Sequence, residues 1–374
     1  MTDTARQRLE MRQDLNSTIN ARLQKRYHDE WIESQQDLNV VVRLVSEKDA
    51  SLRHIKIIQN FHDVLDVSDF LDALDGSQVQ TVAFVGINMD KDYSIKLAKS
   101  LSDKNSCIAC LQLCRIMPRG LVDICPAVSY CESLKELSLT FDHDLPTEGI
   151  ELLMRSLGSS RTLEIFKLFC ADLQGESTRL LANAVLESTS LVDMRITSCN
   201  LTDITCLAEA IQQNNRLTRV DFSMNQISDT SALATLWSCP SITYLNVSQN
   251  EIGSESITMS SKKLIRKHFD RLASNTTLTH LHLDMNPMGP DFVEQLRISL
   301  QKNTTLTRLG FLSLTVSKEA ADRIRYLISL NVAGRGKVQK GLPAELIPQI
   351  LGRVSHEPDL IHGLITQAPH LWLY

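Results

Sequence analysis

The sequence predicts an α/β solenoid, a horseshoe with a parallel concave sheet, convex helices and a helical cap at each end. Three observations predict it: a strand-like leucine pattern recurs along the chain, helix-like segments lie between its copies, and one phrase is almost duplicated. That phrase is NTTLTHLHLDM from Asn275 and NTTLTRLGFLS from Asn303, 28 residues later. A self-similar period of this length is the signature of stacked structural units.

The strand-like pattern is Leu-x-x-Leu-x-Leu-x-x-Asn/Cys-x-Leu, where x is any residue. Copies of it begin at residues 79, 108, 134, 163, 191, 217, 242, 278 and 306, and all intervals but one lie between 25 and 29 residues. The Asn or Cys position is filled by Cys199, Asn225, Asn250 and Asn286. Since this leucine spacing is that of a strand with one buried face, we expect nine parallel strands.

The helix-like segments place apolar residues three and four positions apart before a polar stop. The clearest of them cover residues 149–160, 177–188, 206–215 and 291–303. One unit cannot bury its own apolar face, but stacked units share a continuous core. The repeat leucines and asparagines are therefore expected to be structural.

This pattern resembles the leucine-rich repeat, and its unit length resembles the ribonuclease-inhibitor type, in which each strand is followed by a full helix. The match covers residues 76–330, or about nine units. The resemblance implies a leucine-rich-repeat solenoid that binds a partner protein, usually on the concave sheet, and it names no partner.

The segments on either side of the repeats are interpreted as caps, because terminal repeats need covering. Residues 1–75 form the N-terminal segment and cap, and residues 331–374 form the C-terminal cap. LNVVVRLV from Leu38 is rich in β-branched residues and could be a strand, whereas FHDVLDVSDFLDALDG from Phe61 indicates an acidic amphipathic helix. The first 35 residues could be a partner-binding helix, a mobile tail or a docked helix.

The C-terminal segment predicts two short helices, over residues 343–354 and 358–367, each with a proline in its first turn. It is similar to the tails of intracellular repeat proteins of unicellular algae. It also resembles an F-box in the residues Leu342, Pro343, Glu345, Ile350, Leu351, Asp359, Leu360 and Trp372. That resemblance implies the substrate-receptor subunit of a ubiquitin ligase, and the alternative is a hydrophobic cap on the solenoid.

Composition and charge exclude several classes of function. The formal net charge is -5 and the pI is about 6.1, so no global positive field favours nucleic acid or anionic membrane. The nine cysteines are irregularly spaced, which favours free thiols in a reducing compartment. The sequence shows no long apolar run and no recognisable secretory signal. We therefore expect a cytoplasmic chain, monomeric by itself, without nucleic-acid or membrane partners.

Strand side chains alternate, so residues at the second, fourth and sixth positions after the first leucine of each copy are expected on the concave face. In the later copies they form the candidate partner-binding set: Asp193, Arg195, Arg219, Asp221, Tyr244, Asn246, His280, His282, Asp284 and Arg308. In the earlier copies they include the apolar or weakly polar residues Val85, Cys110, Cys114, Ile165 and Phe169. An apolar half beside a polar half is typical of an interface with anchor and specificity regions, unless the N-terminal segment covers the apolar half.

Neighbouring strands should pair opposite charges on this face. Parallel register places Asp193 beside Arg219 and Arg195 beside Asp221. Exposed pairs of this kind contribute only about 0 to 1 kcal/mol. The charges could therefore neutralise one another or orient a charged partner.

The motif HLHLD would project His280, His282 and Asp284 from one face of one strand. These side chains could hold a metal ion together with Asn246 or Tyr244 from the next strand, or they could contact solvent or a partner. We expect no metal and no cofactor.

The longest interval between copies, before Leu278, contains an insertion of about eight residues and a basic helix. The basic residues are Lys262, Lys263, Arg266, Lys267, His268 and Arg271. Such a helix on an acidic chain could contact phosphate or an acidic partner, or it could be a solvated outer face.

No catalytic motif is recognisable. The GRG at residues 334–336 lacks the preceding strand and the Lys-Ser/Thr of a phosphate-binding loop, and no Gly-x-Ser-x-Gly turn occurs. We predict a protein-interaction scaffold, and not an enzyme, that binds a partner protein on its concave face. The alternatives are the ubiquitin-ligase adaptor and a GTPase-activating repeat protein.

Overall fold

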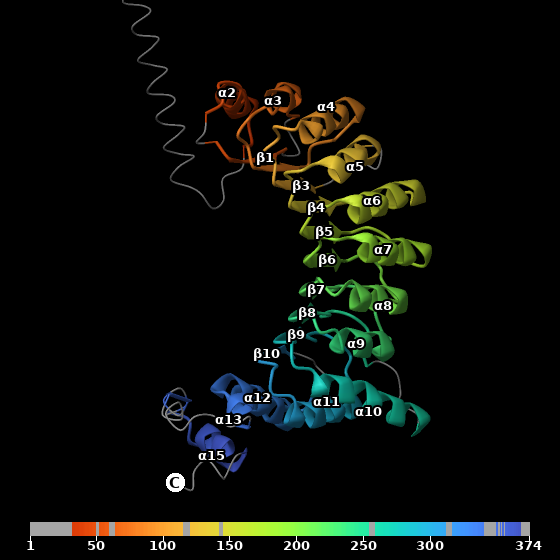
Figure 1. The fold of residues 1–374 in the computed structure, drawn as a ribbon, viewed down its shortest axis with the longest axis vertical. Helices are drawn as coiled ribbons and strands as arrows, with labels where there is room; N and C mark the ends of the chain where they lie inside the picture. The colour runs from red at the N-terminus through yellow and green to blue at the C-terminus, as the bar shows by residue number, and fades with distance from the viewer. Residues whose placement is uncertain are drawn as a thin grey trace, which may run out of the picture.

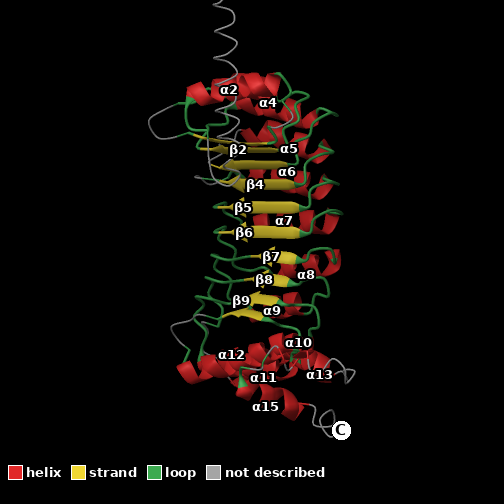
Figure 2. Cartoon of the chain, turned by 90° about the vertical axis from the view of Figure 1, so that its left-hand side faces the viewer, coloured by secondary structure: helices red, strands yellow, loops and turns green. Residues whose placement is uncertain are grey.

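The computed structural model describes residues 32–49, 52–59, 64–114, 120–141, 145–253, 259–311, 316–339 and 349–367, the last range without 351, 353 and 355. Within these residues the predicted α/β solenoid is confirmed: a ten-stranded parallel sheet forms one side, and helices line the other (Figure 1). The strands follow one another in chain order, so each unit packs on its neighbours. Figure 2 views the molecule from the open side of the sheet.

The strands are shortest in the second half of the sheet. They are β1 (His54–Ile58), β2 (Thr81–Val85), β3 (Cys110–Cys114), β4 (Glu136–Thr140), β5 (Ile165–Phe169), β6 (Asp193–Thr197), β7 (Arg219–Asp221), β8 (Tyr244–Asn246), β9 (His280–His282) and β10 (Arg308–Gly310). The helices are α2 (Gln35–Ser46), α3 (Ser68–Ala73), α4 (Lys91–Ser102), α5 (Leu121–Tyr130), α6 (Thr147–Ser159), α7 (Glu176–Glu187), α8 (Thr205–Asn214), α9 (Thr230–Trp237), α10 (Met259–Ser274), α11 (Pro290–Lys302), α12 (Lys318–Ala333), α13 (Arg335–Gln339) and α15 (Pro358–Gln367).

One apolar core runs between the sheet and the helices. In the unit of β6, for example, the pattern residues Leu191, Met194 and Ile196 are fully buried. The nine predicted strands are present as β2 to β10, and the four predicted helices are α6, α7, α8 and α11. The leucine period therefore predicted the strand positions because burial of one strand face is what the period records.

The sheet begins one unit earlier than the pattern search indicated. β1 pairs with β2 in parallel, and Ile32 adds a single bridge to Ile57 at the outer edge. Leu52, Ile55 and Ile57 occupy the buried leucine positions of this unit. The sheet thus extends into the segment that the sequence analysis assigned to the N-terminal cap.

The segment from Leu38 is a helix, α2, so the expectation of a strand there was wrong. Its apolar residues are buried along one helical face, and the Ser34 hydroxyl accepts a hydrogen bond from the Asp37 amide at 3.1 Å as an N-terminal cap. Packing of this face outweighs the weak strand preference of its valines. α3 is a six-residue helix, shorter than the helix expected from Phe61. The first 31 residues lie outside the described part, so the alternatives for their role stay open.

A first row of asparagines lies in the buried turns after β7, β8 and β9 and satisfies backbone groups there. The side-chain oxygen of Asn225 accepts hydrogen bonds from the amides of Cys199 and Leu201 at 2.9 and 3.1 Å. Its Nδ2 donates to the carbonyl of Ile196 at 2.8 Å. Asn250 and Asn286 make equivalent contacts in the next two units. Each asparagine therefore ties its own turn to the unit before it.

A second row of asparagines serves the turns before β7, β9 and β10, and Asn331 continues it in α12. Nδ2 of Asn303 donates to the carbonyls of Leu272 and Asn275 at 2.8 and 3.0 Å, and its oxygen accepts from the amide of Leu306 at 2.9 Å. Asn214, Asn275 and Asn331 occupy equivalent positions and also donate to carbonyls of the preceding unit. The duplicated phrase NTTLT is this turn.

The C-terminal helices do not continue the row of helices on the convex side. Figure 1 shows α12, α13 and α15 on the strand side of the last repeat, so they form a wall at one end of the concave face. They enclose a small separate core. The buried Arg335 joins this cap to the repeats, because its Nη2 donates to the carbonyls of Leu300 and Asn303 at 2.7 and 2.5 Å.

Two of the F-box-like positions that are described help to build this cap, whereas Asp359 is exposed. Ile350 and Leu360 are both buried in the small core beside Leu330. The second predicted helix of the tail is α15, whereas Leu342, Pro343, Glu345, Leu351 and Trp372 lie outside the described residues. The adaptor hypothesis therefore stays a prediction.

We expect Asn225→Ala to lower the free energy of unfolding by about 2 to 4 kcal/mol, because it leaves the buried amides of Cys199 and Leu201 without a partner. Urea unfolding followed by circular dichroism measures the change. The matched control is Asn183→Ala on the exposed side of α7, where we expect a change within about 0.5 kcal/mol. Equal effects of the two substitutions would contradict the role of the asparagine row.

Candidate functional site

All ten residues of the candidate partner-binding set lie on the concave side of β6 to β10, and we call them the polar face. Strand register aligns one column as Asp193, Arg219, Tyr244, His280 and Arg308. It aligns a second column as Arg195, Asp221, Asn246 and His282, which ends at Gly310. The predicted placement beside one another in a parallel sheet is therefore confirmed.

Asp193 is the buried residue on which two arginines of the polar face are anchored. Its carboxylate accepts hydrogen bonds from Nε and Nη2 of Arg195 at 3.1 and 2.8 Å, and it lies 3.3 Å from Nε of Arg219. The Asp193 side chain is only 9% exposed, whereas Arg195 and Arg219 are 36% and 45% exposed. The hydrogen bond to Asp193 raises the pKa of Arg195. The carboxylate thus holds two guanidinium groups over itself and presents positive charge to the concave space.

The second expected charge pair is not formed, although Arg195 and Asp221 are opposite in register. Arg195 turns to Asp193 on its own strand, because that carboxylate can accept its two parallel N–H groups. Asp221 instead accepts hydrogen bonds from the hydroxyl of Ser223 at 2.6 Å and from Nδ2 of Asn246 at 2.9 Å. Asp221 and Asn246 are therefore positioned by a hydrogen-bonded pair and not by an ion pair.

Tyr244 connects the arginines to the histidines. The guanidinium carbon of Arg219 lies 4.1 Å from the centre of the Tyr244 ring, a cation–π distance. The same ring lies 5.4 Å from the ring of His282 and 6.0 Å from that of His280. Burial, followed by the nearby Asp221, raises the pKa of Tyr244. A chain of contacts therefore runs from Arg195 through Asp193, Arg219 and Tyr244 to the two histidines.

Gly310, which has no side chain, leaves room for the neighbouring side chains of His282 and Asp284. Nδ1 of His282 lies 3.7 Å from Oδ2 of Asp284. A Cβ atom at Gly310 would approach that same Asp284 oxygen to 1.9 Å, so only glycine fits there without displacing the carboxylate. Within the part of the chain that the structure describes, no three His, Cys, Asp or Glu side chains are arranged to hold a metal ion.

His280 titrates below the usual range of histidine. Burial lowers its pKa first, and electrostatic repulsion, mainly from the charge of Arg308, lowers it further. Its Nδ1 lies 2.8 Å from the hydroxyl of Thr279. Near neutral pH the ring is therefore uncharged beside two arginines.

The earlier half of the concave face is less apolar than the sequence analysis indicated. Val85, Cys110, Cys114, Ile165 and Phe169 are all half-buried on this side. Between them lies an ion pair that the analysis missed, with Nζ of Lys167 2.6 Å from a carboxylate oxygen of Glu136. The alternation rule that selected the other residues also selects these two, because they occupy the same columns.

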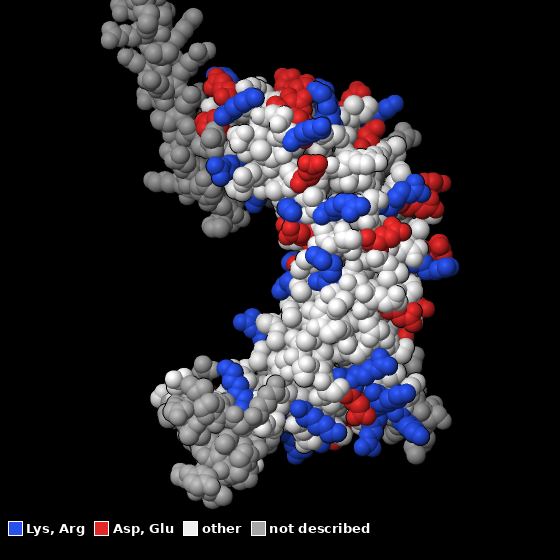
Figure 3. All heavy atoms as spheres, viewed as in Figure 1, with Lys and Arg blue, Asp and Glu red and all other residues white. Residues whose placement is uncertain are grey.

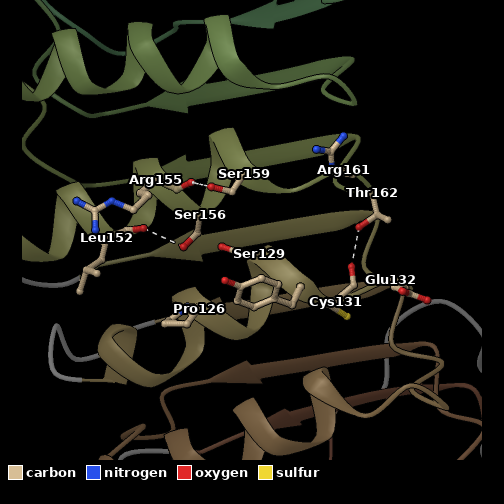
Figure 4. A pocket seen from close by; sticks show the side chains of 11 residues that line it. Pro126, Ser129, Cys131, Glu132, Leu152, Arg155, Ser156, Ser159, Arg161 and Thr162 are labelled. Atoms are coloured by element: carbon tan, nitrogen blue, oxygen red, sulfur yellow. Dashed lines mark hydrogen bonds between the residues drawn. The ribbon is translucent and has the colours of Figure 1, made fainter.

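Hollows occur on both sides of the solenoid. Figure 4 shows one on the convex side between α5 and α6, about 560 Å³ in volume and lined by Pro126, Ser129, Tyr130, Cys131, Glu132, Leu152, Arg155, Ser156, Ser159, Arg161 and Thr162. Its arginines point in different directions, and the Ser156, Ser159 and Thr162 hydroxyls donate to backbone carbonyls. This hollow therefore brings together no convergent set of reactive groups.

The second hollow, about 440 Å³, lies where the polar face meets the C-terminal wall. It is lined by Asp284, Leu309, Gly310, Phe311, Ile324, Arg325, Ile328 and Ser329. Its walls come from β10 and α12, so the turn of α12 onto the strand side creates it. The polar face thus ends in a partly apolar corner.

No disulfide links the nine cysteines, all of which lie in the described part of the chain. All nine are free thiols. Burial raises the pKa of Cys125, Cys199 and Cys239 to about 12, so these three are protonated core residues at neutral pH. Among the described helices, none has the length and apolar character needed to span a membrane.

Comparison with known proteins supports the repeat assignment. The family model described as "Leucine Rich repeat" matches residues 213–234, 238–259 and 274–291. Ribonuclease inhibitors are similar to 56% of the chain, at 25% identity over 214 residues for the Mus musculus protein and 28% over 215 residues for the Sus scrofa protein. The chain spans 46% of the length of each of these relatives.

Two further proteins are more distant. Protein NLRC5 of Homo sapiens is 24% identical over 312 residues, which cover 64% of this chain and 16% of that protein. The crystal structure of an internalin from Listeria monocytogenes covers 83% of this chain and 92% of its own, at 17% identity and a TM-score of 0.34. With the sheet described above, the sequence matches show that the fold is an α/β leucine-rich-repeat solenoid resembling the ribonuclease-inhibitor type.

We expect Arg308→Ala to raise the pKa of His280, because it removes one of the positive charges that lower it. Proton NMR titration of the histidine ring measures this shift. Arg216→Ala is the control, since Arg216 is exposed and is not among the groups that shift His280. A folded-state pKa below that of an unfolded histidine means that the unfolded chain takes up the proton first. This contribution therefore lowers the free energy of unfolding as pH falls below 6.5.

Proposed function

We propose that this solenoid is a protein-interaction scaffold that binds a partner protein on the polar face. The observation that supports the proposal most directly is the buried Asp193 carboxylate beneath two exposed guanidinium groups. A buried carboxylate is costly unless it is paired, and here its pairing fixes two arginines in a defined position. Arginine and tyrosine held in this way are the residues that dominate binding energy in protein interfaces.

The exposed charge on this face indicates the chemistry of the partner. Arg219 and Arg308 are exposed, whereas the acids among their neighbours are buried or half-buried. A partner with carboxylates opposite the arginines and an apolar or aromatic side chain against Tyr244 would complement the surface. The partly apolar corner beside α12 offers a second anchor for the same partner.

The relatives are consistent with a binding role. Two of them are named for inhibition of a ribonuclease, which is an action on another protein. We propose that this chain also acts by binding another protein, and we do not propose that this protein is a ribonuclease. The GTPase-activating and ubiquitin-ligase alternatives have no observation in the described residues that favours them over direct binding.

The test uses the full chain as bait in a lysate of the cell from which it comes, with bound proteins identified by mass spectrometry and then purified for affinity measurements. We expect the triple variant Arg219→Ala, Tyr244→Ala and Arg308→Ala to bind the purified partner at least about 30-fold more weakly, because each side chain is a candidate hot spot.

The matched control carries the same residue changes on the convex side, Arg155→Ala, Tyr130→Ala and Arg161→Ala. These three residues are exposed and lie around the hollow of Figure 4. Binding that survives the polar-face substitutions, or that falls equally in the control, would show that the partner uses another surface.

A further inference from the structure

Charge is distributed unevenly along the solenoid. Residues 35–258 contain 18 Lys and Arg against 29 Asp and Glu, whereas residues 259–340 contain 14 against 6. In the space-filling view of Figure 3, Lys and Arg gather over the end of the molecule where α10 and α11 lie. An acidic chain thus carries a locally basic end.

α10 is firmly packed on its inner side. The Phe269 ring lies 5.1 Å from the Trp237 ring of α9 and 4.8 Å from the Phe292 ring of α11. The hydroxyl of Ser299 on α11 donates to the carbonyl of Phe269 at 2.9 Å. The helix therefore cannot rotate without losing core contacts, and its outer side is fixed toward solvent.

Four basic residues occupy that outer side, and we call them the basic face: Lys263, Arg266, Lys267 and Arg271. All four are exposed, and none forms an ion pair with another described residue. The sequence analysis also counted His268 among the basic residues, but this was wrong. His268 is buried with its Nδ1 3.2 Å from the Thr230 hydroxyl, and burial lowers its pKa.

The basic face carries a cost to the folded chain. Lys263, Lys267 and Arg271 follow one another at intervals of four residues, and like charges at this spacing destabilise a helix by about 0.2 to 0.5 kcal/mol per pair. Asp270 is the one acid on the exposed side of the described part of α10. Nothing in the packing of the helix requires four cations here, so a negatively charged ligand would relieve the repulsion.

We propose that the basic face binds an acidic segment of a second protein. From Lys263 to Arg271 the helix rises about 12 Å, a length that four residues of an extended acidic peptide or two turns of an acidic helix would match. The positive charges that would pair with the acidic segment all lie on one helix, α10. This surface lies on the helix side of the solenoid, away from the polar face, so one chain could hold two partners at once.

The same geometry favours a protein segment over other polyanions. Duplex DNA carries one charge per about 1.7 Å and would extend beyond the basic face onto the acidic remainder of the chain, which repels it. An anionic membrane would need an apolar side to insert, but Leu264 is the one large apolar side chain exposed on the described part of α10. A short acidic segment fits within the length of the basic face and needs no apolar side, so neither objection applies to it.

The test measures fluorescence anisotropy of the full chain with a labelled peptide that contains six glutamates separated by serine and glycine. We expect micromolar binding at about 50 mM salt that weakens at least tenfold at about 300 mM, because exposed charges are screened. The variant K263E/R266E/K267E/R271E should lose at least tenfold in affinity while keeping the circular dichroism spectrum and melting temperature of the parent chain.

Comparisons with other variants and other ligands make the result decisive. The control K104E/R155E/R161E/R216E makes the same change in net charge at exposed positions elsewhere on the described chain, and the variant R195E/R219E/R308E removes the cations of the polar face. Loss confined to the α10 variant supports the proposal, and an equal loss in either comparison overturns it. A peptide with glutamine in place of glutamate should not bind. Tighter binding of single-stranded RNA, or of phosphatidylserine vesicles, would assign the basic face to that ligand instead and would also overturn the proposal.

Discussion

The whole structure depends on satisfying the backbone groups that stacking buries. A solenoid unit turns twice, once after its strand and once before it, and neighbouring units cover both turns so that water cannot reach them. In the later units two rows of asparagines make up the missing hydrogen bonds, exemplified by Asn225 and Asn303. Both rows bridge to the preceding unit, so they also fix how the units stack.

The residues that hold the fold together differ from those on the concave face, so the concave residues are available for binding. The inward leucines and the asparagines determine the path of the backbone, and the concave positions between them face solvent. A second set of constraints then orders some of these side chains. The buried Asp193 holds two arginines, and Gly310 leaves space for Asp284. These contacts turn a row of strand residues into a defined surface.

Periodicity predicted the sheet well because it measures burial directly. It missed β1, where Leu52, Ile55 and Ile57 follow the same spacing but isoleucine fills two of the three leucine positions. It also could not assign the segment from Leu38, whose valines suit either a strand or a buried helical face. The alternation rule predicted which side chains share the concave face, including Glu136 and Lys167, which were overlooked.

By itself the sequence determined the repeat, the direction of each strand side chain and the identity of the concave columns, because all three follow from a period that burial imposes. Only the tertiary structure decided which charges meet. Arg195 pairs within its own strand and Asp221 with Asn246, since hydrogen-bond geometry and burial, not register, select the partner. The tertiary structure also placed α12 against the end of the sheet and turned the cations of α10 outward, because these depend on packing between elements that no local pattern encodes.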